Sequence, residues 1–184
     1  MDNGAEYYRR FLSGDKEALR LIVEEYYGGL CLYLNLFVGN AADAEDMAEE
    51  TLFQLISKRP AFSGKSSFKT WLYAIGRHTA IRFIRHRSHE TVTAEAEAVL
   101  KWESGDAERQ LLTEERDRKL YEGLSKLKEE YRQALWLRYF EEMDNKGIAT
   151  VMKKTVYSVE HLLKRAKDAL REELVKEGFP YEEY

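Results

Sequence analysis

Proline and cysteine are scarce in this sequence, and one long stretch of it contains no acidic residue. Only two prolines, Pro60 and Pro180, occur among 184 residues. Almost the whole chain is therefore free to form helices, since proline is the residue that breaks them. Leu, Ala, Glu, Lys and Arg dominate the composition, and all five favour helices. We predict an all-α fold.

Other absences limit where the chain works. Cys31 is the only cysteine, which excludes an internal disulfide framework and favours a reducing compartment. The first fifteen residues, MDNGAEYYRRFLSGD, lack the apolar core of a signal peptide. The longest nearly apolar run, 28–39, is shorter than the about 20 residues that span a bilayer. We expect a cytoplasmic protein without membrane insertion.

Charge is sorted into blocks along the chain. Residues 1–57 carry four basic and eleven acidic side chains, whereas 58–87 carry eight basic and none acidic. Residues 88–123 carry five basic and ten acidic side chains, and 124–184 carry twelve of each. Such sorting suggests two partners of opposite charge, although a solvated helix face would explain any single block.

The first half of the chain has the apolar spacing of three helices. Apolar residues recur at intervals of three and four from Asp15 to about Phe37, where two central glycines could mark a bend. Asn40 is a suitable N-cap for a second helix, which should end before Pro60. Its expected inward side chains are Met47, Leu52, Leu55 and Ile56.

A third helix should follow the SGKSS loop, from about Phe68 to Arg87. On a helical wheel, Leu72, Ile75, Thr79 and Phe83 share the face expected in the core. A neighbouring stripe consists of Trp71, Ala74, His78, Arg82 and Arg85. Packing alone does not call for a row of cations beside an aromatic ring. The alternative is that Trp71 lies at the edge of the core.

The second half begins with a polar, acidic segment, 88–123, which we interpret as a linker. A helix is expected from Ser125 to about Glu142, then a short helix around Ile148. A last helix should run from about Thr155, its N-cap, to about Val175. Two helices joined by the KKT turn form a helix-turn-helix pattern, which other helical hairpins also show.

Taken together, these segments resemble the extracytoplasmic-function (ECF) class of bacterial sigma factors. One stretch that carries the resemblance is DAEDMAEETLFQLISKRPAFSGKSSFKTWLYAIGRHTAIRFIRHR, with its acidic helix, serine-rich loop and basic helix. The other is LSKLKEEYRQALWLRYFEEMDNKGIATVMKKTVYSVEHLLKRAKDALREEL, similar to the family's C-terminal helix-turn-helix. The resemblance covers 18–174. It implies two small helical domains, 1–87 and 124–184, joined by the linker.

The resemblance also implies functions for particular residues. A sigma factor binds core RNA polymerase and directs it to promoters, with an anti-sigma factor as a further partner. The polymerase-binding residues would be Asp43, Glu45, Asp46, Glu49 and Glu50. The minus-ten promoter element would meet Ser66, Ser67, Lys69, Trp71, Arg77, His78, Arg82 and Arg85. The minus-35 element would meet Lys154, Thr155, Tyr157, Ser158, His161, Lys164 and Arg165.

Several positions depart from the family pattern. Gly76 and His78 stand where alanine and asparagine are common, which affects the details of base capture. Lys153 replaces the usual turn glycine, so an altered turn is expected, because positive φ is uncommon outside glycine. Glu160 stands in the recognition helix and can pair with Lys164 one turn later. These changes predict different or weaker upstream recognition.

Two other functions are compatible with parts of the sequence. A regulator that binds polymerase without recognising DNA would fit the weakly basic recognition helix. A metalloenzyme would require ligands, and His86-x-x-His89 has a possible ligand spacing, but no Cys or acid neighbours it at motif spacing. Glycine-rich phosphate loops and nucleophile motifs are absent from the sequence. We therefore expect neither enzymatic activity nor a cofactor.

Overall fold

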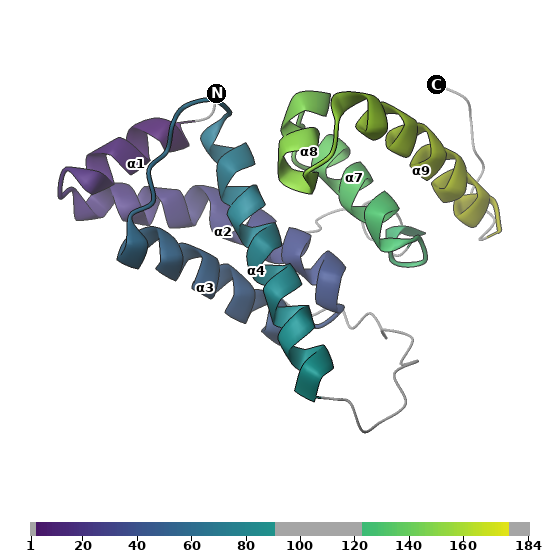
Figure 1. The fold of residues 1–184 in the computed structure, drawn as a ribbon, viewed down its shortest axis with the longest axis horizontal. Coiled ribbons are helices and arrows are strands. Elements are labelled where there is room, and N and C mark those ends of the chain that lie inside the picture. The colour runs from purple at the N-terminus through teal and green to yellow at the C-terminus, as the bar shows by residue number, and fades with distance from the viewer. Residues whose placement is uncertain (1–2, 91–122, 177–184) are drawn as a thin grey trace. The chain divides into compact units, whose positions relative to one another are not determined.

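The computed structural model describes residues 3–90 and 123–176, and the chain divides into two compact units, Met1–Ser104 and Gly105–Tyr184 (Figure 1). We call them the N-terminal and C-terminal domains. Within the described residues every regular element is a helix, which confirms the all-α prediction. The predicted linker, 88–123, falls almost entirely outside the described residues and stays a prediction.

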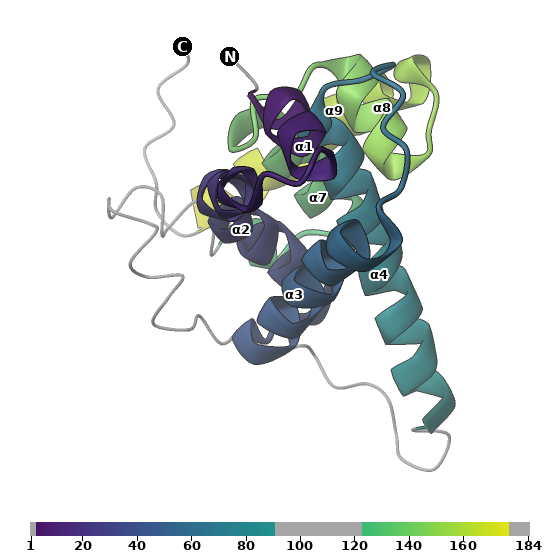
Figure 2. The same cartoon turned by 90° about the vertical axis from the view of Figure 1, so that its left-hand side faces the viewer.

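The N-terminal domain is built around one long helix, α2 (Lys16–Val38). Helices α1 (Gly4–Leu12), α3 (Ala41–Lys58) and α4 (Phe68–Glu90) each pack against it, and α4 also packs along α3 (Figures 1 and 2). By length and composition α2 could cross a membrane, but more than half of its most apolar stretch is buried inside the domain. It is therefore the core helix of this domain.

Local sequence fixes where these helices begin and end. The side chain of Asp15 accepts hydrogen bonds from the backbone N–H groups of Glu17 and Ala18 at 3.0 and 3.4 Å, which caps α2. Gly39 ends α2 in the left-handed conformation, with φ of 63°. The Asn40 side chain accepts from the Asp43 N–H at 3.0 Å, as the N-cap prediction required. Helix α2 continues through its two central glycines without interruption.

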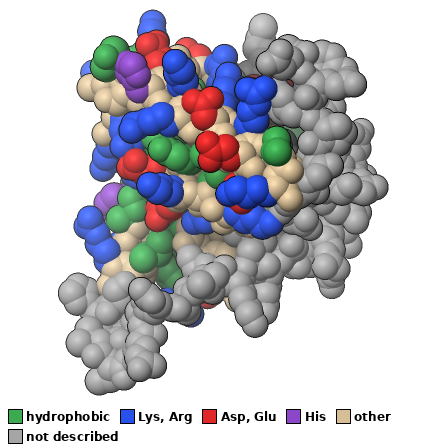
Figure 3. Space-filling model, turned by 90° about the vertical axis from the view of Figure 1, so that its right-hand side faces the viewer, with side chains coloured by type: hydrophobic (Ala, Val, Ile, Leu, Met, Phe, Trp, Pro, Cys, Tyr) green, Lys and Arg blue, Asp and Glu red, His purple; other side chains and the backbone are tan. Residues whose placement is uncertain are grey.

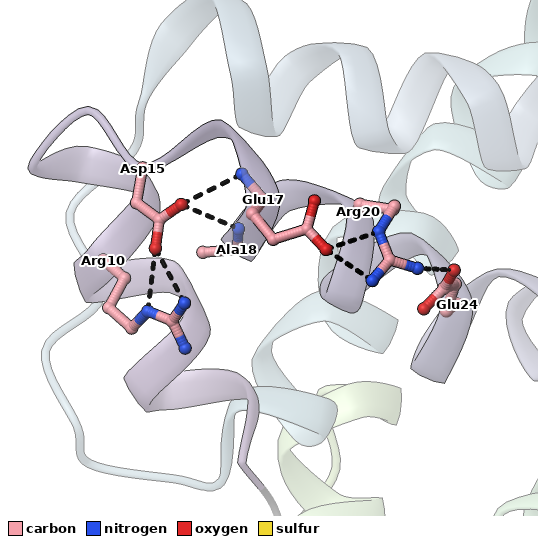
Figure 4. A network of polar contacts seen from close by, with 6 residues as sticks. All are labelled: Arg10, Asp15, Glu17, Ala18, Arg20 and Glu24. Atoms are coloured by element: carbon pink, nitrogen blue, oxygen red, sulfur yellow. Dashed lines mark hydrogen bonds and ion pairs between the residues drawn. The ribbon is translucent and has the colours of Figure 1, made fainter.

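Helix α1 was not predicted from the sequence, and it packs closely because Gly4 has no side chain. A Cβ atom at Gly4 would lie 2.3 Å from Cδ1 of Phe68, which no real structure tolerates. Gly76 similarly allows α2 and α4 to pack closely, because a Cβ atom at this position would lie 2.9 Å from Cδ1 of Leu30. Arg10 ties α1 to α2 by donating two hydrogen bonds to Asp15, at 2.9 and 2.7 Å (Figure 4).

The C-terminal domain contains α7 (Glu129–Tyr139), α8 (Asn145–Met152) and α9 (Val156–Lys176). Helix α7 is shorter at both ends than the predicted helix, 125–142. The core of the C-terminal domain is centred on Trp136. The Trp136 ring stacks on that of Phe140 with centroids 4.1 Å apart, and its indole N–H donates a hydrogen bond to Glu141 at 3.2 Å.

The connection between α8 and α9 keeps a tight turn without glycine. Lys153 adopts the left-handed conformation itself, with φ of 53° and ψ of 47°. The following N–H, of Lys154, donates to the Ala149 carbonyl at 2.9 Å, and Thr155 caps α9 by accepting from the Ser158 N–H at 3.1 Å. The expected alteration of the turn at Lys153 is therefore not found, and the two helices form the predicted helix-turn-helix.

Candidate protein- and DNA-binding surfaces

The solvent side of α3 carries a mixed acidic and apolar stripe. Asp46 and Glu49 are exposed, and so are Phe53 and Ile56, at 61% and 38% of their surface. Spacings of three, four and three residues place these four side chains on one face of the helix. The inward prediction for Ile56 was wrong, whereas Met47, Leu52 and Leu55 are buried as predicted. We call these four exposed residues the α3 stripe.

Part of the acidic block pairs with the basic block across the α3–α4 interface. The guanidinium of Arg82 lies 3.1 Å from the Glu50 carboxylate, and that of Arg87 lies 2.7 Å from Asp43. Glu50 also accepts a hydrogen bond from Gln54 at 2.9 Å. The two blocks are thus separate in sequence but joined by ion pairs in space, and the suggestion that they serve two different partners stays a prediction.

A pocket of about 350 Å³ opens between the same two helices. Its lining consists of Asp46, Met47, Glu50, Thr79, Arg82, Phe83 and His86. Residues predicted to meet polymerase and residues predicted to meet DNA therefore line one cavity. Thr79 is buried as predicted, but Phe83 is only partly buried and borders this pocket instead of the core.

Trp71 lies at the edge of the core and not on an exposed stripe. Its indole ring packs against the rings of Tyr8, Phe62 and Phe68, with centroids 5.1 to 5.5 Å away. Of the two interpretations that the sequence left open for Trp71, the position at the edge of the core is the one found. The ring is partly buried in an aromatic cluster that joins α1, α4 and the loop between α3 and α4.

This loop is held at both ends. The Tyr8 hydroxyl donates to the Pro60 carbonyl at 2.9 Å, and burial raises the pKa of Tyr8, so the phenol keeps its proton. At the other end, Ser67 accepts from the Thr70 N–H at 3.1 Å and caps α4. Between these anchors, Phe62 packs on the aromatic cluster.

The remaining minus-ten candidates lie on or before α4. His78, Arg82 and Arg85 are exposed on that helix. Arg77 and Lys69 are partly buried, and each takes part in interactions within the protein. Ser66 donates to the Ser67 carbonyl at 3.2 Å. His78, Arg82 and Arg85 are therefore accessible on α4, although Arg82 also pairs with Glu50, and the serine hydroxyls are partly used by the loop itself.

The first turns of α9 border an open pocket of about 540 Å³. Its lining consists of Glu130, Lys154, Tyr157, Ser158, His161, Leu162 and Arg165. Five of these are predicted minus-35 contacts, while the remaining two candidates, Thr155 and Lys164, are exposed beside them. The Tyr157 and His161 rings meet edge to face at 4.4 Å, and 70% of Tyr157 is exposed.

Sequence inspection missed the acidic member of this pocket. Glu130 on α7 accepts a hydrogen bond from Nζ of Lys154 at 2.9 Å, across 24 positions of sequence. On the face shown in Figure 3, basic and acidic side chains of the described residues are likewise interspersed. No group of three or more metal-ligating side chains occurs among the residues that the structure describes.

Each of the two domains matches a known family model. Residues 22–90 match the family model "Sigma-70 region 2", and residues 117–170 match "Sigma-70, region 4". The RNA polymerase sigma-H factor of Pseudomonas aeruginosa is 32% identical over 170 residues, which cover 88% of each chain. The chain belongs to the ECF sigma factors. It therefore directs promoter-specific initiation of transcription.

Other proteins are similar to this chain in sequence or in fold. The ECF RNA polymerase sigma-E factor of Escherichia coli is 26% identical over 170 residues, again 88% of each chain. CnrH, solved in complex with the cytosolic domain of CnrY, shares the fold with a TM-score of 0.65 at 20% identity. That match covers 94% of this chain and 95% of CnrH. Helix α1 lies outside both matched family models.

Proposed function

We propose that the sigma factor divides its work between three surfaces. The α3 stripe docks on core RNA polymerase, the α3–α4 loop with α4 opens the minus-ten element, and the α9 pocket recognises the minus-35 element. The observation that carries this proposal is the α3 stripe, where large apolar side chains remain exposed beside carboxylates. Exposed apolar side chains that are contiguous and bordered by polar residues mark protein-interaction sites.

The α3 stripe suits a protein partner better than DNA. Phe53 and Ile56 supply apolar area, and Asp46 and Glu49 would repel phosphates while attracting a basic helix. The partner surface should therefore be basic with an apolar centre. Core polymerase is the partner that the sigma family implies.

The minus-ten surface combines cations on α4 with a braced loop. Arg82 and Arg85 would contact phosphates, and His78 lies between them and the loop. The loop would receive an unstacked base, whose extraction costs a few kcal/mol. Trp71 supports this loop from within the aromatic cluster, because its ring packs against Phe62.

The α9 surface would enter the major groove at the minus-35 element. Residues near the N-terminus of a recognition helix lie nearest the bases, so Tyr157, Ser158 and His161 would make base contacts. Arg165 and Lys164 lie further along α9 and would contact phosphates.

The RpoE sigma factor of Bartonella quintana was solved in complex with the anti-sigma factor NepR. We propose that this chain also binds an anti-sigma factor and that it is a cytoplasmic protein.

Charge reversal on the α3 stripe tests the docking surface. Asp46→Lys with Glu49→Lys should abolish retention of the sigma factor on immobilised core polymerase and leave helical circular dichroism unchanged. The control is Glu24→Lys with Glu25→Lys, two exposed acids of α2. Retention of the stripe variant at the level of the control would remove this docking assignment.

Promoter-dependent run-off transcription separates a sigma factor from an adaptor that only binds polymerase. Core polymerase supplemented with the chain should start transcripts on templates selected from a random promoter pool. Polymerase binding without any selected template would instead support the adaptor.

A further inference from the structure

The α9 pocket contains one carboxylate among side chains that are otherwise basic, neutral or aromatic. Glu130 belongs to α7, and it meets the α9 surface through Lys154 in the turn before that helix. A carboxylate on a surface that faces phosphates is repelled by them. Its position therefore calls for an explanation other than affinity for DNA.

The two partners differ in how much of each side chain is exposed. The Glu130 side chain is 57% exposed, whereas that of Lys154 is 27% exposed. The Lys154 side chain is thus the more covered member of the pair, and the Glu130 side chain is the more exposed one. A phosphate that approaches this corner of the pocket meets the Lys154 ammonium together with an exposed carboxylate.

We propose that Glu130 restrains upstream DNA binding by neutralising Lys154, an inference that rests on the proposed role of the α9 surface. The pair as a whole carries no net charge, so Lys154 releases no counterion from DNA while Glu130 holds it. The sequence-independent part of the affinity is lowered for every DNA equally. Base contacts from Tyr157 and His161 then carry more of the upstream binding, and non-specific sites retain the holoenzyme for a shorter time.

A base-reading role for Glu130 predicts something different. A carboxylate can accept a hydrogen bond from the amino group of cytosine, and its removal would then change which sequence is preferred. A restraining role changes affinity for all sequences by the same factor. Affinity and preference must therefore be measured separately.

The test uses holoenzyme formed from core polymerase and the full chain. The probes are a duplex selected by the wild-type holoenzyme from a random pool and a mixed-sequence duplex of equal length. Binding is measured from 50 to 200 mM salt. Glu130→Gln should bind both probes several-fold more tightly, and its slope of log affinity against log salt should steepen by about 0.9, the value for one additional phosphate contact. Glu130→Gln with Lys154→Gln should return the slope to that of the wild type.

Glu172→Gln is the matched control, because it removes the same charge from an exposed site on α9. Eleven residues separate it from His161, or about 16 Å along the helix, at 1.5 Å per residue. This distance exceeds the screening length of about 8 Å at physiological salt. The control should leave both slope and affinity unchanged.

Each result decides the question. Unchanged or weaker binding by Glu130→Gln would overturn the proposal, and so would a changed ratio between the two probes. An equal gain from Glu172→Gln would also overturn it, because the effect would then be one of net charge. If Arg165→Ala and Tyr157→Ala left upstream binding unchanged, the proposed role of α9 would fail, whatever Glu130→Gln did.

Discussion

The guanidinium of Arg82 on α4 lies 3.1 Å from the carboxylate of Glu50 on α3, so a predicted DNA contact is bound to a predicted polymerase contact. Both side chains are about half exposed, which makes the pair weak in water. Either partner can therefore be drawn away by a stronger one. A surface that binds the α3 carboxylates would release Arg82 toward phosphates.

The weakness of this ion pair can be measured with a double-mutant cycle. Glu50→Gln, Arg82→Gln and the combination should give a coupling free energy below about 1 kcal/mol in thermal unfolding, the usual range for exposed pairs. The combination Glu50→Gln with Lys58→Gln, which shows no ion pair with Glu50, serves as the reference. A coupling of several kcal/mol would mean that the pair is structural and does not open.

Promoter opening should depend on the exposed side chains of α4. Arg82→Ala with His78→Ala should leave polymerase binding intact, because the α3 stripe is untouched. The same variant should lose permanganate reactivity of minus-ten thymines, since the phosphate contacts that hold the open strand are removed. Arg20→Ala, which removes a guanidinium bound to Glu17 and Glu24 on α2, should open promoters normally. Normal opening by the double variant would reduce this face of α4 to a solvated surface.

The hydroxyl of Tyr8 should matter for opening although α1 lies outside the matched family models. Tyr8→Phe keeps the aromatic packing but leaves the Pro60 carbonyl without this 2.9 Å hydrogen bond. We expect a loss of about 0.5–1.5 kcal/mol in the free energy of unfolding, typical of one hydrogen bond. Thymine reactivity in the promoter complex should fall further than polymerase binding does, because the loop loses an anchor. Tyr7→Phe is the neighbouring control. Equal losses in both assays would indicate general destabilisation only.

Local patterns in the sequence predicted much of this fold. Spacing of apolar residues predicted α2 and α3, and capping chemistry predicted the starts at Asn40 and Thr155. Helix α1 was not predicted, because the contacts that stabilise it are made with residues far away in the sequence. Gly4 packs against Phe68, and Tyr8 bonds to Pro60. A nine-residue helix has little stability of its own, so its sequence pattern is short and weak.

The candidate surfaces were predicted less completely than the helices. The resemblance to sigma factors implied binding surfaces at Tyr157 and His161 and at the acidic residues of α3, and Tyr157, His161, Asp46 and Glu49 are all exposed. The pairing of Glu130 with Lys154 was not predicted, because the two residues are 24 positions apart and belong to different elements of the fold. The setting of Trp71 depends on rings from α1 and the loop, which no wheel of α4 contains.

Lys153 should be a site where a glycine stabilises the protein. A side chain in the left-handed region costs about 1–2 kcal/mol, and the extra freedom of glycine in the unfolded chain returns about 0.4–1 of that. Lys153→Gly should therefore raise the free energy of unfolding of the C-terminal domain by roughly 0.5–1 kcal/mol. Lys153→Asn controls for the lost charge, and Lys153→Val should be destabilising. A lower melting temperature for the glycine variant would contradict the strain at this turn.

Acid should weaken the junction between α1 and α2 through Asp15. Hydrogen bonds from Arg10 lower the pKa of this carboxyl most strongly, and those from the backbone of Ala18 and Glu17 lower it further. A group with a lowered pKa in the folded state stabilises the protein above its unfolded pKa, about 3.9, and loses that contribution as pH falls through the folded value. Asp15→Asn keeps a good N-cap but cannot form the ion pair, so its melting temperature should fall below that of the wild type at pH 7.

The two melting curves should then converge as the pH is lowered below about 3.9, because the protonated wild type has lost the same ion pair. Asp15→Ala should have a lower melting temperature than Asp15→Asn both at pH 7 and at pH 3, since alanine cannot cap the helix. The melting temperature of the full chain, followed by circular dichroism at 222 nm, measures all three. A constant gap between wild type and Asp15→Asn from pH 7 to pH 3 would contradict this prediction, because it would show that the charge of Asp15 contributes nothing to stability.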